Sequence, residues 1–268
     1  MLIVGTASLV QIATLVLASP FVPIYTTLPA YEPAGQSGAG PILNSLLLIG
    51  MAALVTVVML VFVKLRKESL LKAMLAIFIS IGSISITYTL GAVWLSYLLD
   101  DPYIPALGLG LIFSSAIFLV TLWPKFRRLG LMVSILMAVL FATSFAIFMK
   151  PPTSLVLPIA FAIYDIYAVF AGPLKALLTQ KGSNIDYFAP LLLNLGGIHI
   201  GLGDFIFYGM LPTTGLLLVG LTASVMVSLI ILGGLAATLL MLRRFRMFPG
   251  LPIPLILGTV ALAAVLYL

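Results

Sequence analysis

Gly201-Leu202-Gly203-Asp204-Phe205-Ile206-Phe207-Tyr208 sets a single carboxylate, that of Asp204, in a run of glycine, aliphatic and aromatic residues. An earlier stretch, Ala162-Ile163-Tyr164-Asp165-Ile166-Tyr167-Ala168-Val169, does the same with Asp165. A carboxylate inside a membrane-spanning helix costs roughly 2.5–3.5 kcal/mol on insertion scales, so such a residue faces a partner or water and is usually functional. The two aspartates are therefore candidate site residues if the sequence around them spans a membrane.

The composition indicates that it does. Of 268 residues, 63% are hydrophobic and 7% are charged, and the mean hydropathy is +1.30. An ordinary soluble domain has roughly a quarter charged residues. This chain has too few polar residues to cover a core of its size with a wetted surface, which excludes a water-soluble globular enzyme. Its apolar runs are continuous rather than alternating, which excludes a β-barrel. An all-α polytopic membrane protein remains.

The rarer residue types exclude further classes. The chain has no cysteine, which excludes thiol nucleophiles and cysteine-based metal or iron–sulfur sites. Its one histidine excludes any site that needs two imidazoles. The net charge of +6 comes from basic residues scattered between apolar spans, with no basic face for a nucleic acid. We expect no metal, no cofactor and no nucleic-acid partner.

A spanning helix needs about 20 apolar residues. We expect nine spans, at Leu2–Val22, Ile42–Val63, Leu70–Leu99, Ala106–Trp123, Leu129–Met149, Thr153–Pro173, Gly197–Leu211, Leu216–Leu242 and Leu251–Leu268. The first span has no basic residue before it, so it is interpreted as a retained helix rather than a signal peptide.

The basic residues predict the orientation of these spans. Twelve of the thirteen fall on one side of the predicted membrane: Lys64, Arg66, Lys67, Lys72, Lys125, Arg127, Arg128, Lys175, Lys181, Arg243, Arg244 and Arg246. Only Lys150 falls on the other side, with Glu32, Asp100 and Asp101. The positive-inside rule then places the N-terminus in the cytosol and the C-terminus outside.

Depth decides whether the two aspartates can meet. Asp165 lies about nine residues, or roughly 13 Å, from the cytosolic end of its span at 1.5 Å per residue. If the seventh helix starts near Gly196–Gly197, Asp204 lies about seven residues, or roughly 10 Å, inside it. The similar depths predict a pair of facing carboxylates.

Two carboxylates held together cannot both ionise cheaply, so the pair shares one proton. One of them can then act as a general base on water while the other hydrogen-bonds the scissile carbonyl of a peptide. The same pair would also serve a cation leak or a proton-coupled transporter. From the two aspartates alone, hydrolysis, ion transport and a purely structural polar clamp between two helices all remain open.

The residues around the aspartates resemble the YD and GxGD motifs of the presenilin family of intramembrane aspartyl proteases, and Pro249-Gly250-Leu251-Pro252 resembles the family's PALP motif. The three motifs occur in the family's order, with Gly250 in place of alanine. Signal peptide peptidases share the first two motifs but have the opposite orientation, and prepilin peptidases share only GxGD. The short loops look like those of a compact microbial homologue.

This resemblance implies a nine-helix aspartic endopeptidase of the GxGD type, with Asp165 and Asp204 as its catalytic dyad. It implies supporting or substrate-binding roles for Tyr164, Gly201, Gly203, Pro249, Gly250, Leu251 and Pro252. Residues 1–183 would form a six-helix part ending in a cytosolic loop, and residues 184–268 a three-helix part of the same membrane domain. The expected partners are the lipid bilayer and single-span membrane substrates, and the expected location is the cell membrane of a microbe. Assembly with further copies of the chain is left open.

Overall fold

The computed structural model describes residues 1–122, 127–170, 192–195, 198–244 and 249–267. These residues form nine α-helices: α1 (Leu2–Ala18), α2 (Gly40–Lys64), α3 (Glu68–Leu95), α4 (Tyr103–Leu122), α5 (Arg127–Phe148), α6 (Thr153–Phe170), α8 (Leu202–Leu218), α9 (Leu221–Arg244) and α10 (Pro252–Tyr267). A 3₁₀ helix, η1 (Ser19–Thr27), continues α1. Pro20 and Pro23 lie in η1 and have no N–H for an α-helical ladder, which is why α1 ends early.

Seven helical segments of the described chain are long and apolar enough to cross a membrane, the first of them being α1 together with η1. The other two helices, α8 and α10, are apolar but shorter, with 17 and 16 residues. The helical architecture predicted from the sequence is confirmed. The expected boundary between residues 183 and 184 lies outside the described residues.

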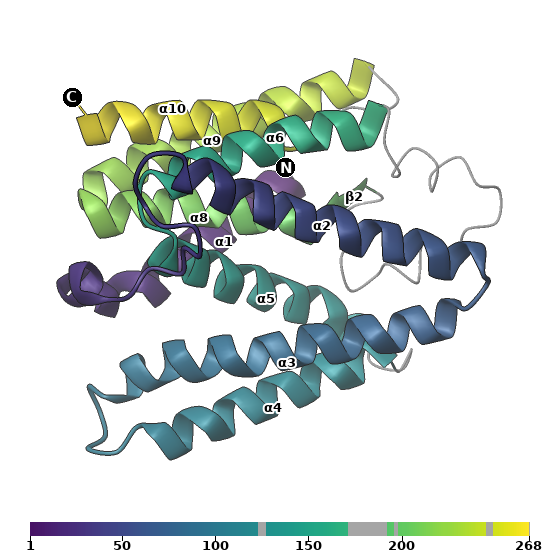
Figure 1. The fold of residues 1–268 in the computed structure, drawn as a ribbon, viewed down its shortest axis with the longest axis horizontal. Helices are drawn as coiled ribbons and strands as arrows, with labels where there is room; N and C mark the ends of the chain where they lie inside the picture. Colours follow the sequence, from purple (N-terminus) through teal and green to yellow (C-terminus); the bar gives the residue numbers. More distant parts are fainter. Residues whose placement is uncertain (123–126, 171–191, 196–197, 245–248, 268) are drawn as a thin grey trace.

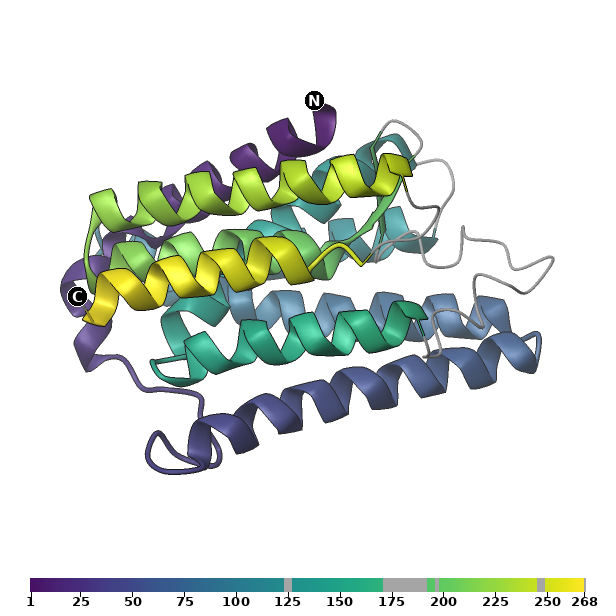
Figure 2. The same ribbon diagram turned by 90° about the horizontal axis from the view of Figure 1, so that it is seen from above.

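The helices run side by side, with α8 at the centre of the group (Figures 1 and 2). Helix α8 packs against α1, α5, α9 and α10, whereas α6 packs against α2 and α10. The antiparallel pair α3–α4 lies on the other side of α5 (Figure 1).

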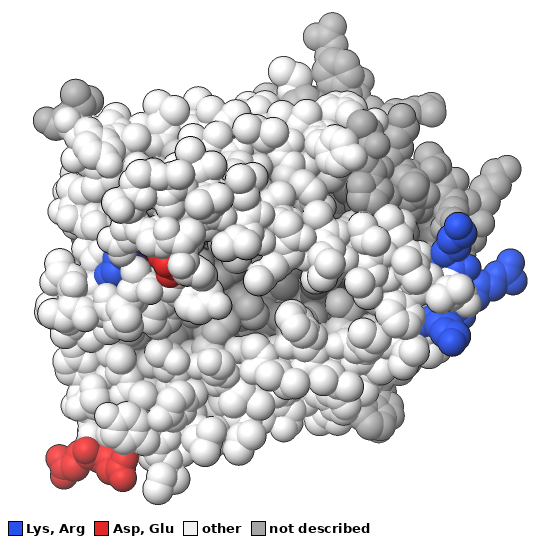
Figure 3. Space-filling model, viewed as in Figure 1, with Lys and Arg blue, Asp and Glu red and all other residues white. Residues whose placement is uncertain are grey.

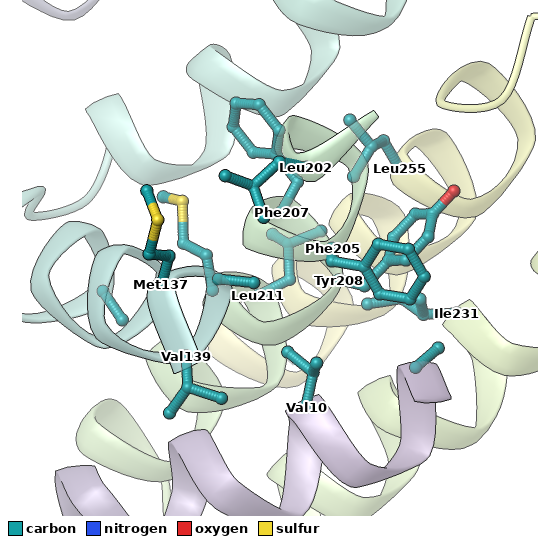
Figure 4. Packing of buried hydrophobic residues seen from close by; sticks show 14 of the residues in the cluster. Val10, Met137, Val139, Leu202, Phe205, Phe207, Tyr208, Leu211, Ile231 and Leu255 are labelled. Atoms are coloured by element: carbon teal, nitrogen blue, oxygen red, sulfur yellow. The ribbon is translucent and has the colours of Figure 1, made fainter. Parts of the chain in front are cut away.

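Close packing around α8 depends on small residues. A Cβ added to Gly209 would lie 2.9 Å from Thr14 Cγ2 on α1 and 3.0 Å from Ala142 Cβ on α5. Glycine there lets three helix backbones approach one another. Figure 4 shows the side chains of Phe205, Tyr208 and Leu211 directed into the apolar cluster that this approach creates.

Two described segments before α8 are strands, and here the sequence-based prediction was wrong. Strands β1 (Leu192–Leu195) and β2 (Ile198–Gly201) pair antiparallel, with Leu195 opposite Ile198. Helix α8 therefore begins at Leu202 rather than near Gly197, and it continues past the expected end at Leu211 to Leu218. Asp204 is the third residue of this helix, not about the seventh. Hydropathy cannot distinguish an apolar strand from the first turn of an apolar helix.

Charged residues separate toward the two ends of the helices. Figure 3 shows most of the Lys and Arg side chains on this face at one end and the acidic side chains at the other, where one basic group lies beside an acidic one. Exposed Lys64, Arg66 and Lys67 lie at the turn from α2 to α3, whereas Asp100 and Asp101 lie between α3 and α4.

Lys150, the basic residue on the unexpected side, joins the turn between α5 and α6 to η1 and the loop after it. Its ammonium group lies 3.4 Å from the ring centroid of Tyr25 and donates to the Tyr25 carbonyl. The Lys150 backbone N–H donates to Glu32 Oε1 at 2.9 Å. Lys150 thus has local partners in the fold, which explains a cation on the acidic side.

Candidate functional site: two aspartates at one turn

Asp165 lies in α6 and faces the chain segment that leads into α10. The backbone N–H of Leu251 donates to Asp165 Oδ2 at 3.0 Å. Helix α6 packs against α10, so the segment before α10 lies beside the carboxylate. The Asp165 side chain is partly buried.

Asp204 lies in the first turn of α8, where its carboxylate sits between two glycines. A Cβ added to Gly250 would lie 2.7 Å from Asp204 Oδ2, and one added to Gly201 would lie 3.2 Å from Oδ1. The carboxylate thus occupies space that a side chain on either residue would need. These contacts give Gly201 and Gly250 a common role, which is to leave room for the Asp204 carboxylate.

The two aspartates therefore meet at one turn. Gly250 contacts Asp204, and its neighbour Leu251 binds Asp165. Pro249, Leu251 and Pro252 are buried, and α10 begins at Pro252. Proline fits the first position of a helix without the loss of a helical hydrogen bond, and it disfavours the helical conformation of the residue before it. The sequence itself therefore keeps Leu251 out of the helix. The Leu251 N–H is then free to bind a carboxylate.

The structure also locates two of the expected supporting residues, Tyr164 and Gly203. The Tyr164 hydroxyl lies 3.5 Å from Thr56 Oγ1 and so makes a polar contact with α2. Gly203 is exposed, and no described atom lies within 4 Å of a Cβ added to it. Gly203 thus leaves open space beside Asp204 instead of allowing a close helix contact.

Sequence reasoning missed two residues of this region, Tyr208 and Gln11. The Tyr208 hydroxyl donates to the Gly250 carbonyl at 3.1 Å, and Gln11 Nε2 donates to the Tyr208 carbonyl at 3.2 Å. Tyr208 lies four residues after Asp204, on the same face of α8, and this spacing is the signal that could have found it. Gln11 is a lone amide in an apolar helix, but nothing in the sequence pairs it with α8.

The part of the chain that the structure describes holds no group of three or more His, Cys, Asp and Glu residues able to bind a metal. The polar groups at the turn are the two carboxylates, backbone groups and the Tyr208 hydroxyl. This set can hold a water and a peptide carbonyl and can move a proton between them.

No protein-family model matches the chain, but its sequence and fold are similar to those of known proteins. Over 105 residues the sequence is 37% identical to Presenilin-B of Dictyostelium discoideum, and the alignment covers 36% of this chain. It spans 22% of the length of that relative.

Two solved structures are similar over nearly the whole chain. Both are of a presenilin family intramembrane aspartate protease, in the C222 and P2 space groups, with TM-scores of 0.63 and 0.62. Sequence identities are 21% and 24%, and each match covers 97% of this chain and 96% of the other. The chain is therefore presenilin-like in its fold and, over the stretch that it shares with Presenilin-B, in its sequence.

Proposed function

We propose that the chain is an intramembrane aspartyl protease whose catalytic dyad is Asp165 and Asp204. One observation carries the proposal: in the turn before α10, the Gly250 backbone lies beside the Asp204 carboxylate, and the N–H of the next residue, Leu251, donates to the Asp165 carboxylate. Two intramembrane carboxylates on different helices are thereby held at one place, as acid–base hydrolysis requires.

In this mechanism the dyad shares one proton and holds a water between its carboxylates. The unprotonated carboxylate takes a proton from the water, whose oxygen attacks the carbonyl carbon of the substrate. The protonated carboxylate donates to the carbonyl oxygen. The carboxyl group that took the proton from water then gives it to the amide nitrogen, and the other carboxylate takes a proton back from a hydroxyl of the tetrahedral intermediate. The carbon–nitrogen bond breaks, two peptide products are released, and the dyad again holds one proton. The Leu251 N–H keeps Asp165 Oδ2 in place during these transfers.

The substrate class follows from the position of the site. Both aspartates lie in apolar helices, so the peptide bond that is cut belongs to a membrane-embedded segment. A helical substrate satisfies its own backbone groups, so it must unwind locally to expose a bond. The open space at Gly203 and the irregular turn before α10 are where we place the unwound segment.

The test is a cleavage assay in liposomes with a tagged single-span membrane protein as substrate. We expect Asp165→Ala and Asp204→Ala each to abolish cleavage. Asp100→Ala is the matched control, because Asp100 is an exposed carboxylate between α3 and α4, and it should leave cleavage unchanged. If either dyad variant cuts as well as the wild type, the dyad assignment is wrong.

The same liposomes test the alternative of a cation leak or proton-coupled transporter. Ion flux is measured with the wild type, both dyad variants and Asp100→Ala. Cleavage that depends on both aspartates supports the protease. Flux that depends on both aspartates, together with no cleavage of any substrate, overturns it in favour of transport.

A further inference from the structure

Helix α8 contains a proline, and a side chain from another helix compensates for it. Pro212 is buried in α8 and has no N–H, so the carbonyl four residues earlier, that of Tyr208, lacks its helical partner. Gln11 Nε2 of α1 donates to this carbonyl at 3.2 Å. Gln11 is 2% exposed, so this amide lies in the core. A buried carbonyl without a partner is costly, and Gln11 removes that cost while fixing α8 at Tyr208.

The Tyr208 side chain makes the next contact. Its ring is 1% exposed and packs in the core, while its hydroxyl donates to the Gly250 carbonyl at 3.1 Å (Figure 4). Gly250 precedes Leu251, whose carbonyl accepts the first bond of α10 from Leu255. Pro252 and Pro254, in the first turn of α10, have no N–H to offer the Gly250 carbonyl. The tyrosine hydroxyl supplies the donor instead.

The Gly250 carbonyl and the Leu251 N–H belong to one planar peptide unit, and they point in opposite directions. Tyr208 holds the carbonyl end, and the N–H end donates to Asp165 Oδ2. The Cα of the same Gly250 faces the Asp204 carboxylate. The orientation of this single peptide plane therefore determines how both carboxylates of the dyad are contacted.

We propose that Tyr208, anchored by Gln11, is a positioning residue that fixes the Gly250–Leu251 peptide against both aspartates. The proposal rests on the protease function for its kinetic consequence. The hydroxyl is the informative group, because a phenylalanine ring fills the same core space without it. Hydrogen bonds in series also polarise one another, so the tyrosine strengthens the donor that Asp165 receives.

Tyr208→Phe is the direct test, with Tyr97→Phe as its matched control. The Tyr97 hydroxyl also donates to a backbone carbonyl at 3.1 Å, that of Pro20, but it lies on α3's side of the molecule, away from the dyad. We expect Tyr208→Phe to lower kcat about tenfold with little change in KM. The acidic limb of the pH–kcat profile should move to higher pH, because weakening a donor to a carboxylate disfavours its charged form. Tyr97→Phe should leave kcat and the pH profile unchanged.

Hydrogen exchange provides a readout that needs no substrate. The Leu251 amide should exchange faster in Tyr208→Phe than in the wild type, and at the wild-type rate in Tyr97→Phe. An unchanged Leu251 exchange rate overturns the proposal, whether or not the protein cleaves anything. An unchanged kcat and pH profile, in a protein whose cleavage requires Asp165 and Asp204, overturns the kinetic part and leaves the protease function standing.

Gln11→Met tests the anchor, because methionine has a similar shape and no donor. We expect the same changes as in Tyr208→Phe, but smaller. If the two residues act through one peptide, the double variant should lose less activity than the two separate losses multiplied together. Independent, multiplicative losses would remove Gln11 from the proposal.

Discussion

At Gly250 this chain differs by one methyl group from the family motif that it resembles. The position that a Cβ would take lies 2.7 Å from Asp204 Oδ2, closer than such atoms approach in folded proteins. The carboxylate of Asp204 therefore rests on the glycine backbone. A side chain on Gly250 would compete for that place with the carboxylate that we propose takes part in the reaction.

We predict that Gly250→Ala lowers kcat severalfold while the Tm stays nearly unchanged. The methyl group meets only the end of a flexible side chain, so the Asp204 carboxylate can rotate away at little cost in stability. Rotation moves the carboxylate out of the position that acid–base catalysis needs, and small misplacements in an active site are costly in rate. Steady-state kinetics and thermal unfolding of one preparation measure both effects.

Gly108→Ala is the control for this substitution, because Gly108 lies in α4 with no described atom within 4 Å of an added Cβ. It should leave kcat unchanged. A Gly250→Ala protein with wild-type kcat would show that the carboxylate works equally well from a second position. A large fall in Tm would show that the turn itself, and not only Asp204, fails to accept the methyl group.

At the scale of single elements, sequence predicted helices well where they are long and apolar, and it failed at short elements. The hairpin before α8 is apolar like its surroundings, so hydropathy merged it with the helix. Ile198 and Ile200 are β-branched residues that favour strand, and the pair between Leu195 and Ile198 is Gly-Gly, which favours two-residue hairpin connections. These local signals were present, but they are weak beside a continuous apolar run.

The sequence could predict some residues of the candidate site and not others. Asp165 and Asp204 stand out because carboxylates are rare and costly in apolar helices. The roles of Tyr208 and Gln11 depend on which carbonyls the prolines leave without partners and on which helices pack together. The spacing of four residues puts Tyr208 on the same face of α8 as Asp204. The carbonyl that its hydroxyl reaches and the partner of Gln11 are set by the tertiary arrangement of α1, α8 and the turn before α10, which no spacing along the chain expresses.

Lys150 yields a prediction about the elements that it connects. Lys150→Met removes the contact of the ammonium group with the Tyr25 ring and its bond to the Tyr25 carbonyl. A cation–aromatic contact is worth roughly 0.5–1 kcal/mol at an exposed site, so we expect the Tm in detergent to fall by a few degrees. Cleavage should persist, because the residue lies in the turn between α5 and α6, at the opposite end of α6 from Asp165.

At the scale of the whole molecule, the direction of the helices places the dyad toward one end. Helices α2 and α6 both run toward the end where the α2–α3 turn carries its basic residues, and α8 and α10 run in the opposite direction, away from that end (Figures 1 and 2). Asp165 is five residues before the last described residue of α6, and Asp204 is the third residue of α8. The proposed dyad thus lies nearer the basic end than the acidic end. The positive-inside rule predicts that the basic end faces the cytosol.

Because the chain has no native cysteine, single cysteines test this orientation against a blank background. Ser37 is exposed in the loop before α2, and Leu65 is exposed in the turn after it, so they mark opposite ends of one helix. We predict that a membrane-impermeant maleimide labels Ser37→Cys in intact cells and labels Leu65→Cys only after the cells are permeabilised. Retained cleavage by both variants confirms that the labelled protein is folded. The reverse labelling pattern would show that the helices have the opposite orientation in the membrane, with the proposed dyad near the outer face. Cleavage would then release the outer segment of the substrate instead of its cytosolic segment.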